Sequence, residues 1–113
     1  MKRVLIGVAF ALLAAMPGAA NAQDAWAMQR KILYLYPTAG GFSFKLDGAQ
    51  VNPGSPCDAN RMILPLGAPN YDAIIGSIML AFSSNYVVDV AYDSSTVSSC
   101  DTVVNRVVVY RRA

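Results

Sequence analysis

The sequence predicts a small, mainly β domain with five strands and one α-helix, in the order β-β-β-α-β-β. Short segments rich in β-branched and aromatic residues alternate with turns that contain Gly, Pro and Asn, which is typical of sheet proteins. One segment in the middle of the chain repeats its apolar residues at helical spacing instead. Once an expected leader is removed, about 90 residues remain, which is enough for one domain.

The N-terminal segment has the pattern of a cleavable secretory signal peptide. Two basic residues and an apolar run of about a dozen residues precede Ala20-Asn21-Ala22, a small-x-small cleavage signal. The apolar run is too short for the ~20 residues of a membrane-spanning helix. The sequence therefore predicts a signal peptide at 1–22 and a single domain at 23–113. We expect a periplasmic or secreted product without a membrane span after cleavage.

The expected mature domain is electrically neutral. Two of the nine basic residues, Lys2 and Arg3, lie in the leader, and the other seven balance seven acidic residues, all of them Asp. A neutral domain has no general attraction for phosphate backbones or anionic lipid, although a local patch such as Arg111-Arg112 can persist. The balance of charge therefore argues against a nucleic-acid partner.

The chain has two cysteines, Cys57 and Cys100. In an oxidising compartment, an even number of cysteines in a small exported domain indicates a disulfide. A pair of free buried thiols is the alternative. The chain has no His and no other thiol, so a tetrahedral metal site is not expected.

Three strands are expected in the first half of the mature domain. Residues 23–29 are interpreted as a loose lead-in to a first strand at 31–36, which is rich in strand-forming residues. Turn residues at 37–41 separate it from 42–46, where apolar and polar residues alternate as in the second strand of a hairpin. A loop rich in Pro and Gly then leads to a third strand at 61–66.

A helix is expected over 71–83. Asn70 is a candidate N-cap, and Asp72 lies in the first turn, where the helix dipole favours an anion. Leu80 is the one large apolar residue on the polar arc, and it is a candidate contact in an oligomer. The apolar arc consists of Tyr71, Ile74, Ile75, Ile78, Met79, Ala81 and Phe82.

Two further strands are expected after the helix, at 86–92 and 103–111, with a polar loop at 93–99 between them. In the first of them, Val88, Val90 and Tyr92 alternate with Asp89 and Ala91. Asp89 is therefore interpreted as a solvated carboxylate on the outward face of its strand.

Several segments of the mature chain together carry a resemblance. They are RKILYLYP at 30–37, GFSFKLDG at 41–48, Cys57 before the third strand, Pro69-Asn70-Tyr71 at the helix start and Cys100 between the last two strands. With the order of elements, they look like an oligonucleotide/oligosaccharide-binding (OB) barrel. More narrowly, the chain resembles small exported bacterial proteins related to the B subunits of AB5 toxins, in particular the subtilase-cytotoxin type. The resemblance implies a five-stranded OB-like barrel, glycan binding and assembly into a homopentamer.

The resemblance also directs attention to the loop after the fourth strand. Toxin B subunits of this type carry a Trp-Thr-Tyr-Pro segment there, which helps to hold a sialic acid, whereas residues 92–99 of this chain contain neither Trp nor Pro. The stretch Tyr92, Asp93, Ser94 and Ser95 combines an aromatic ring with polar groups that suit hydrogen bonding to sugar hydroxyls. It is the candidate ligand site, and a solvated turn is the alternative.

An enzyme is not expected. The mature chain has no His and no Glu, so it lacks the usual side chains for proton transfer near neutral pH. Asp89 and Asp93 are interpreted as solvated carboxylates rather than an acid pair. The chain shows no Cys-x-x-Cys motif, no phosphate-binding loop and no calcium-binding loop, and no cofactor is expected.

The sequence thus predicts an exported, non-catalytic binding module whose partner is a glycan or a protein. The alternative is a structural or assembly domain without a sugar ligand. It is favoured by the runs at 33–36 and 107–110, which are apolar on both faces and exceed what one small barrel buries. A nucleic-acid-binding OB domain would use aromatic platforms and a basic groove, and charge and export both disfavour it.

Overall fold

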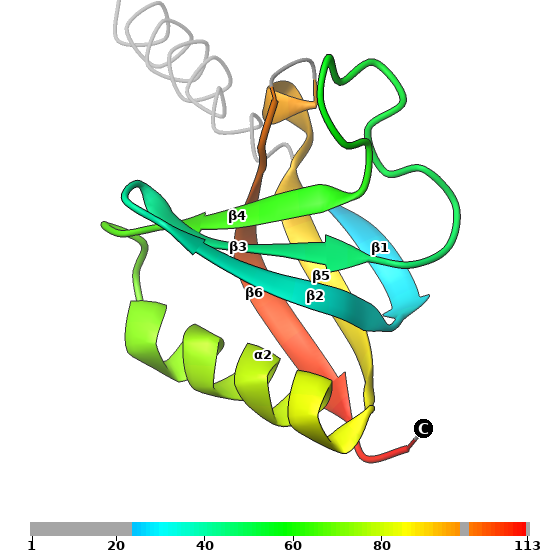
Figure 1. Cartoon of the computed structure of the whole chain (residues 1–113), viewed down its shortest axis with the longest axis vertical. Helices are drawn as coiled ribbons and strands as arrows, with labels where there is room; N and C mark the ends of the chain where they lie inside the picture. Colours follow the sequence, from blue (N-terminus) through cyan, green and yellow to red (C-terminus); the bar gives the residue numbers. More distant parts are fainter. Residues whose placement is uncertain (1–23, 98–99, 113) are drawn as a thin grey trace, which may run out of the picture.

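The computed structural model describes residues 24–97 and 100–112 (Figure 1). Within these residues the chain forms a six-stranded sheet, one α-helix and one short 3-10 helix. The predicted class, mainly β with one α-helix, is confirmed, but the prediction of five strands is wrong. The predicted signal peptide at 1–22 lies outside the described residues. No helix in the described ranges is long and apolar enough to cross a membrane.

The strands are arranged in the sheet in an order that differs from their order in the chain. Their bounds are β1 Asp24–Arg30, β2 Ile32–Thr38, β3 Gly41–Leu46, β4 Arg61–Pro65, β5 Val87–Asp93 and β6 Thr102–Tyr110. The order in the sheet is β1-β5-β6-β4-β3-β2. Neighbouring strands are antiparallel except β4 and β6, which are parallel.

The additional strand is β1, which occupies the segment that the sequence indicated as a loose lead-in. It pairs with β5, and its Ala27 is buried opposite Val90. Lys31 alone separates β1 from β2, so the two ends of the sheet order belong to consecutive segments of the chain. The chain bends between them, with a register shift before Arg30 and a left-handed backbone at Gln29, whose φ is 55°.

The other strands follow the predicted segments closely. β3, β4 and β5 begin and end within one residue of their predicted bounds, and β6 is displaced by one residue. β2 extends to Thr38 and includes Pro37, which the sequence assigned to the following turn. The alternating residues of these strands fill the core. Its largest apolar members are Phe44, Leu46, Met62, Leu64, Ile78, Val88, Val90 and Val104.

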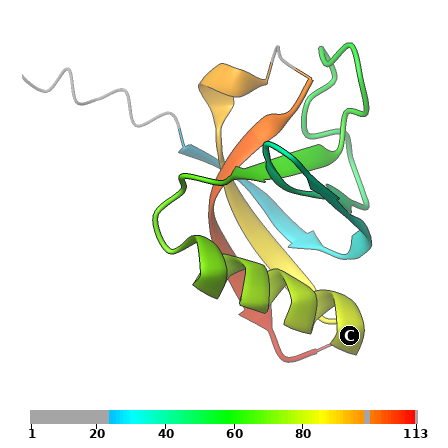
Figure 2. The same cartoon turned by 60° about the vertical axis from the view of Figure 1, so that its left-hand side comes forward.

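Helix α2 (Tyr71–Ser84) connects β4 to β5 and lies against β6 and β2 (Figure 2). Ile78 and Ala81 are buried, but Met79 and Phe82 are exposed although they belong to the predicted apolar arc. The helix therefore buries a narrower stripe than its sequence indicates. The predicted N-cap position of Asn70 is confirmed, but its backbone is left-handed and its side chain makes no capping hydrogen bond.

The disulfide between Cys57 and Cys100 is confirmed, with the two Cα atoms 5.1 Å apart. It links the loop before β4 to the segment before β6. Beside it, the buried Asn52 side chain donates a hydrogen bond to the Thr102 hydroxyl over 3.1 Å. Covalent and polar contacts therefore hold the long loop between β3 and β4 against the start of β6.

Candidate binding face

The outer face of β1, β5 and β6 carries a shallow groove of about 290 Å³, which we call the Trp26 groove. Trp26 of β1 lies opposite Ala91 of β5, and Ala91 lies opposite Arg106 of β6. In the next row, Asp89 lies opposite Val108. Side chains from three strands therefore share one surface. The groove is lined by Trp26, Met28, Asp89, Val108 and Tyr110.

A buried carboxylate forms part of this groove. Asp89 is only 3% exposed. Its Oδ1 accepts a hydrogen bond from the Gln29 backbone N–H over 2.7 Å, and its Oδ2 accepts one from the Tyr110 hydroxyl over 2.5 Å. The interpretation of Asp89 as a solvated carboxylate is therefore wrong. Strand β1, which the sequence did not indicate, covers the flank of β5, and two donors compensate the buried charge.

The Asp89 contacts explain two local features. The bend takes the Gln29 N–H out of the hydrogen-bond ladder between β1 and β5, and this N–H donates to the Asp89 carboxylate instead. At the other oxygen, the hydrogen bond to Asp89 raises the pKa of the Tyr110 hydroxyl, and desolvation and the negative charge of Asp89 act in the same direction. The positive charge of Arg112 opposes this rise in pKa. Asp89 thus fastens both β1 and β6 to β5.

Trp26 is 42% exposed, and a cation lies against its aromatic ring. The Arg106 guanidinium lies 5.3 Å from the ring centroid. It can reach the ring because Ala91, between them, has a small side chain. Asp24 fixes the arginine through an ion pair of 2.5 Å. The ring is therefore oriented by a charged pair while much of it still faces solvent.

The predicted ligand residues lie at the far end of β5 from Asp89. Tyr92 is half-buried against the core, and Ser94 is half-buried. Asp93 caps the 3-10 helix η2 (Ser94–Thr96), where its Oδ1 accepts hydrogen bonds from the N–H and the hydroxyl of Ser95, over 2.9 and 2.7 Å. These bonds lower the pKa of the Asp93 carboxyl. Ser95 is exposed. The structure brings the four residues together at one turn, but the Asp93 carboxylate is engaged in capping that turn.

Leu80, the predicted oligomer contact, is 52% exposed. It lies on the rim of a second groove, of about 300 Å³, between α2 and β6, with Tyr86, Val109 and Arg111 as the other lining residues. A third groove, of about 380 Å³, lies between the segment before α2 and β6, and its lining contains no charged and no aromatic side chain. Among these grooves, the Trp26 groove alone combines exposed aromatic rings with a carboxylate.

Sequence reasoning missed the Trp26 groove. A weak signal was present in β1, where Trp26 and Met28 alternate with Ala25 and Ala27. The alternation has the period of a strand, but the small residues face inward and the large ones outward, the reverse of the usual pattern.

Comparison with models of protein families, with curated proteins and with solved structures finds no match. In the described ranges, no group of three or more His, Cys, Asp or Glu side chains is placed to hold a metal ion.

Proposed function

We propose that the chain is an exported, non-catalytic binding module with an OB arrangement, and that it binds a glycan at the Trp26 groove. The proposal joins the function expected from the sequence to a surface that the sequence did not indicate. Export follows from the leader pattern and agrees with the disulfide, because disulfides persist in oxidising compartments.

The order of the strands supports the OB arrangement. If β1 and β2 are counted as one strand bent at Gln29, the chain has five strands, with α2 between the third and the fourth. The first half of that bent strand pairs with β5 and its second half with β3, so the chain itself bridges the two ends of the sheet. This is the way in which a small sheet closes on itself.

The exposed Trp26 ring beside the Asp89 carboxylate carries the glycan proposal. Ligand sites combine apolar and aromatic surface with a few fixed polar groups. A sugar ring offers both apolar C–H faces and hydroxyls, so Trp26 and Tyr110 suit its faces and Arg106 suits its hydroxyls. The Arg106–Asp24 pair and the Asp89 bonds orient these groups before a ligand arrives, which lowers the entropic cost of binding.

Trp26 is the only tryptophan in the chain, so its fluorescence reports on this groove directly. The exported protein is titrated with a panel of neutral and anionic oligosaccharides while the emission is recorded. We expect a shift in emission with at least one class of glycan. Calorimetry with the same glycan should show that Trp26→Ala weakens binding at least tenfold, the loss of about 1.4 kcal/mol.

Tyr92→Ala is the matched control, because Tyr92 belongs to the stretch that the sequence offers as a candidate ligand site. Binding that survives Tyr92→Ala and is lost in Trp26→Ala supports the Trp26 groove. The opposite result would move the site to the loop at 92–95. No binding to any glycan in the panel would overturn the glycan ligand.

Self-assembly remains the second candidate function, and one observation favours it. Leu33 and Tyr36 of β2 are exposed. Strand β2 is the last strand in the sheet order, whereas the Trp26 groove lies on the first three strands. Large apolar side chains that gather on a surface are typical of protein contacts. Light scattering at micromolar concentration tests it. A homopentamer, which the resemblance implies, would have five times the mass of the mature chain, whereas a monomeric mass would exclude this candidate.

A further inference from the structure

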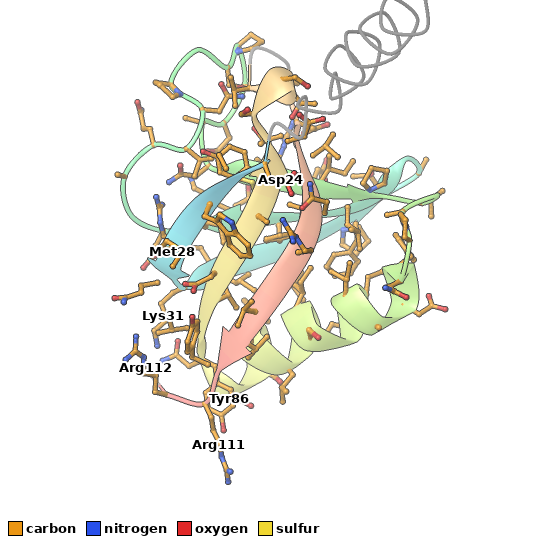
Figure 3. All side chains as sticks on the ribbon, turned by 180° about the vertical axis from the view of Figure 1, so that it is seen from behind. Asp24, Met28, Lys31, Tyr86, Arg111 and Arg112 are labelled. Atoms are coloured by element: carbon orange, nitrogen blue, oxygen red, sulfur yellow. A yellow bond between two sulfur atoms is a disulfide. The ribbon has the colours of Figure 1, made fainter. Side chains whose placement is uncertain are left out.

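Three cations lie together at the end of the molecule where β6 ends. Val87 of β5 pairs with Tyr110, and its N–H bonds to the Arg112 carbonyl over 3.0 Å. On the other side of β5, Arg30 pairs with Val88, which places Lys31 at the same end. Figure 3 shows Lys31, Arg111 and Arg112 at this end. We call these three residues the cationic end.

The charges of the cationic end have no carboxylate partner among the described residues. The Lys31 ammonium donates to the Asn85 carbonyl at the end of α2, over 2.6 Å. The Arg112 guanidinium lies 5.5 Å from the centroid of the Tyr110 ring. Two acidic groups are near. Asp47 accepts the backbone N–H of Lys31, and Asp89 is buried with both oxygens bonded.

Three of the four remaining basic side chains contrast with these, and the fourth, Arg30, donates to the backbone carbonyls of Asp47 and Ala49. The three salt bridges of the described residues join Lys45 to Asp58, Arg61 to Asp101 and Arg106 to Asp24. None of them involves the cationic end. The neutral net charge of the mature chain therefore hides an uneven distribution of charge, with three ion pairs elsewhere and three cations without a carboxylate partner at this end.

Apolar side chains lie among these cations. The groove between α2 and β6 has Arg111 on its lining together with Leu80, Tyr86 and Val109. Leu80 is the apolar residue that stands on the polar arc of the helix, and half of it faces solvent. Tyr86 lies beside Arg111 at this end (Figure 3). A cationic surface with an exposed aliphatic side chain and a half-buried tyrosine beside it suits contact with a membrane surface.

We propose that the cationic end docks on an anionic lipid leaflet. Lys31, Arg111 and Arg112 would lie at the level of the lipid phosphates, and Tyr86 at the interface, where tyrosine is enriched. Leu80 would reach into the boundary of the acyl chains. The exposed Leu80 favours lipid over a soluble polyanion, because a polyanion offers no apolar phase for it. The Tyr110 ring beside Arg112 also lines the Trp26 groove, but the proposal uses no glycan ligand and does not depend on glycan binding.

The test measures co-sedimentation of the exported protein with vesicles of phosphatidylglycerol and phosphatidylcholine. Binding should rise with the phosphatidylglycerol fraction and fall with added salt. Each Lys or Arg near an anionic surface strengthens binding about fivefold. The variant Arg111→Gln/Arg112→Gln should therefore bind about 25-fold more weakly.

The variant Lys45→Gln/Arg61→Gln is the matched control, because it removes the same net charge from the paired side chains. It should bind vesicles like the wild type. An equal loss in both variants, or no binding of the wild type to phosphatidylglycerol vesicles, would overturn the proposal.

The variant Leu80→Gln distinguishes a lipid partner from a soluble anion, because it removes an apolar side chain and leaves the net charge unchanged. It should weaken vesicle binding about fivefold, since a partly exposed Leu gains about half of its full burial energy. It should not alter any binding to heparin or inorganic phosphate. Tight heparin binding that Leu80→Gln leaves unchanged, together with unaltered vesicle binding, would identify a soluble polyanion as the partner instead.

Discussion

The two ends of the molecule are stabilised in different ways. At the end that carries the disulfide, long loops lead into β4 and β6, and the Cys57–Cys100 bond holds them together with the salt bridges of Lys45 and Arg61. At the cationic end, β1, β5, β6 and the end of α2 meet through backbone hydrogen bonds, and the cations are left without carboxylate partners.

The difference indicates where side chains are committed to the fold and where they are available for a partner. Irregular loops have few backbone bonds of their own, so side chains and the disulfide must hold them. Strands and a helix satisfy their own backbone groups. The exposed side chains at the cationic end and around the Trp26 groove, unlike the buried Asp89, are therefore less needed for folding. Substitutions at the two ends should separate stability from binding.

The largest expected effect lies at the disulfide end. Cys57→Ser/Cys100→Ser removes a bond between residues 43 positions apart in the sequence. By loop-closure entropy, the free energy of unfolding should fall by about 4 kcal/mol. Urea unfolding followed by circular dichroism measures it. The wild type with a reducing agent is the control, and it should approach the stability of the double variant. A difference of about 0.5 kcal/mol or less, as for an ordinary surface substitution, would contradict a stabilising role.

The second largest effect is expected at Asp89, which joins three strands near the cationic end. Asp89→Ala leaves the Gln29 N–H and the Tyr110 hydroxyl without their acceptor, and should cost about 3 kcal/mol. Asp89→Asn keeps one acceptor oxygen in the same volume and should cost less. Urea unfolding of both variants tests this order. A cost of Asp89→Ala near that of a surface substitution would show that the carboxylate does not hold β1 and β6.

The fold was predictable where short-range patterns decide the structure. The hairpin strand at 42–46 and the helix after Asn70 both show clear periodicity, and both were predicted within one residue. Cys57 and Cys100 were paired correctly because a two-cysteine chain allows only one internal bond. In each case the information lies in a few neighbouring residues or in a simple count.

The site was not predictable because its contacts join distant parts of the chain. Gln29 is 60 residues from Asp89, and Tyr110 is 21 residues from it. The pattern of β5 alone placed Asp89 on an outward face, which is correct for a strand with a free flank. Strand β1 changes that environment, and its own sequence gives little indication because Ala25 and Ala27 are its inward residues. Missing β1 therefore meant missing both the burial of Asp89 and the Trp26 groove.

A smaller effect should appear in the ionisation of Tyr110. The hydrogen bond to Asp89 raises the pKa of the hydroxyl, so Asp89→Asn should lower that pKa. Because the folded state favours neutral Tyr110, this contribution to stability is complete below the ordinary pKa of tyrosine, about 10, and is lost as the pH rises through the higher folded value. Near-ultraviolet absorbance titration measures it. Subtracting the titration curve of Tyr110→Phe from that of the wild type isolates the ionisation of Tyr110 among the six tyrosines. An identical titration in Asp89→Asn would contradict the bond.

The smallest effect is expected at the Lys45–Asp58 salt bridge, whose atoms are 2.9 Å apart. The hydrogen bond from Lys45 and then that from the Asn60 N–H lower the pKa of the Asp58 carboxyl. The folded state therefore favours the charged carboxylate. Its contribution to stability is present above the ordinary carboxyl pKa of about 4 and is lost as the pH falls through the lower folded value. The effect is small because solvent screens a pair at the surface.

Asp58→Asn should be slightly less stable than the wild type at neutral pH and equal to it in acid. Urea midpoints measured across this pH range test the expectation, since the midpoint resolves small differences better than the extrapolated free energy does. In a Lys45→Gln background the same substitution should lose most of its pH dependence, because the first cause of the lowered pKa is gone. If the loss of stability in Asp58→Asn did not depend on pH, Asp58 would stabilise the fold through its packing and its bond to Asn60, and not through its charge. The paired charges of the disulfide end would then contribute no more to folding than the unpaired charges of the cationic end.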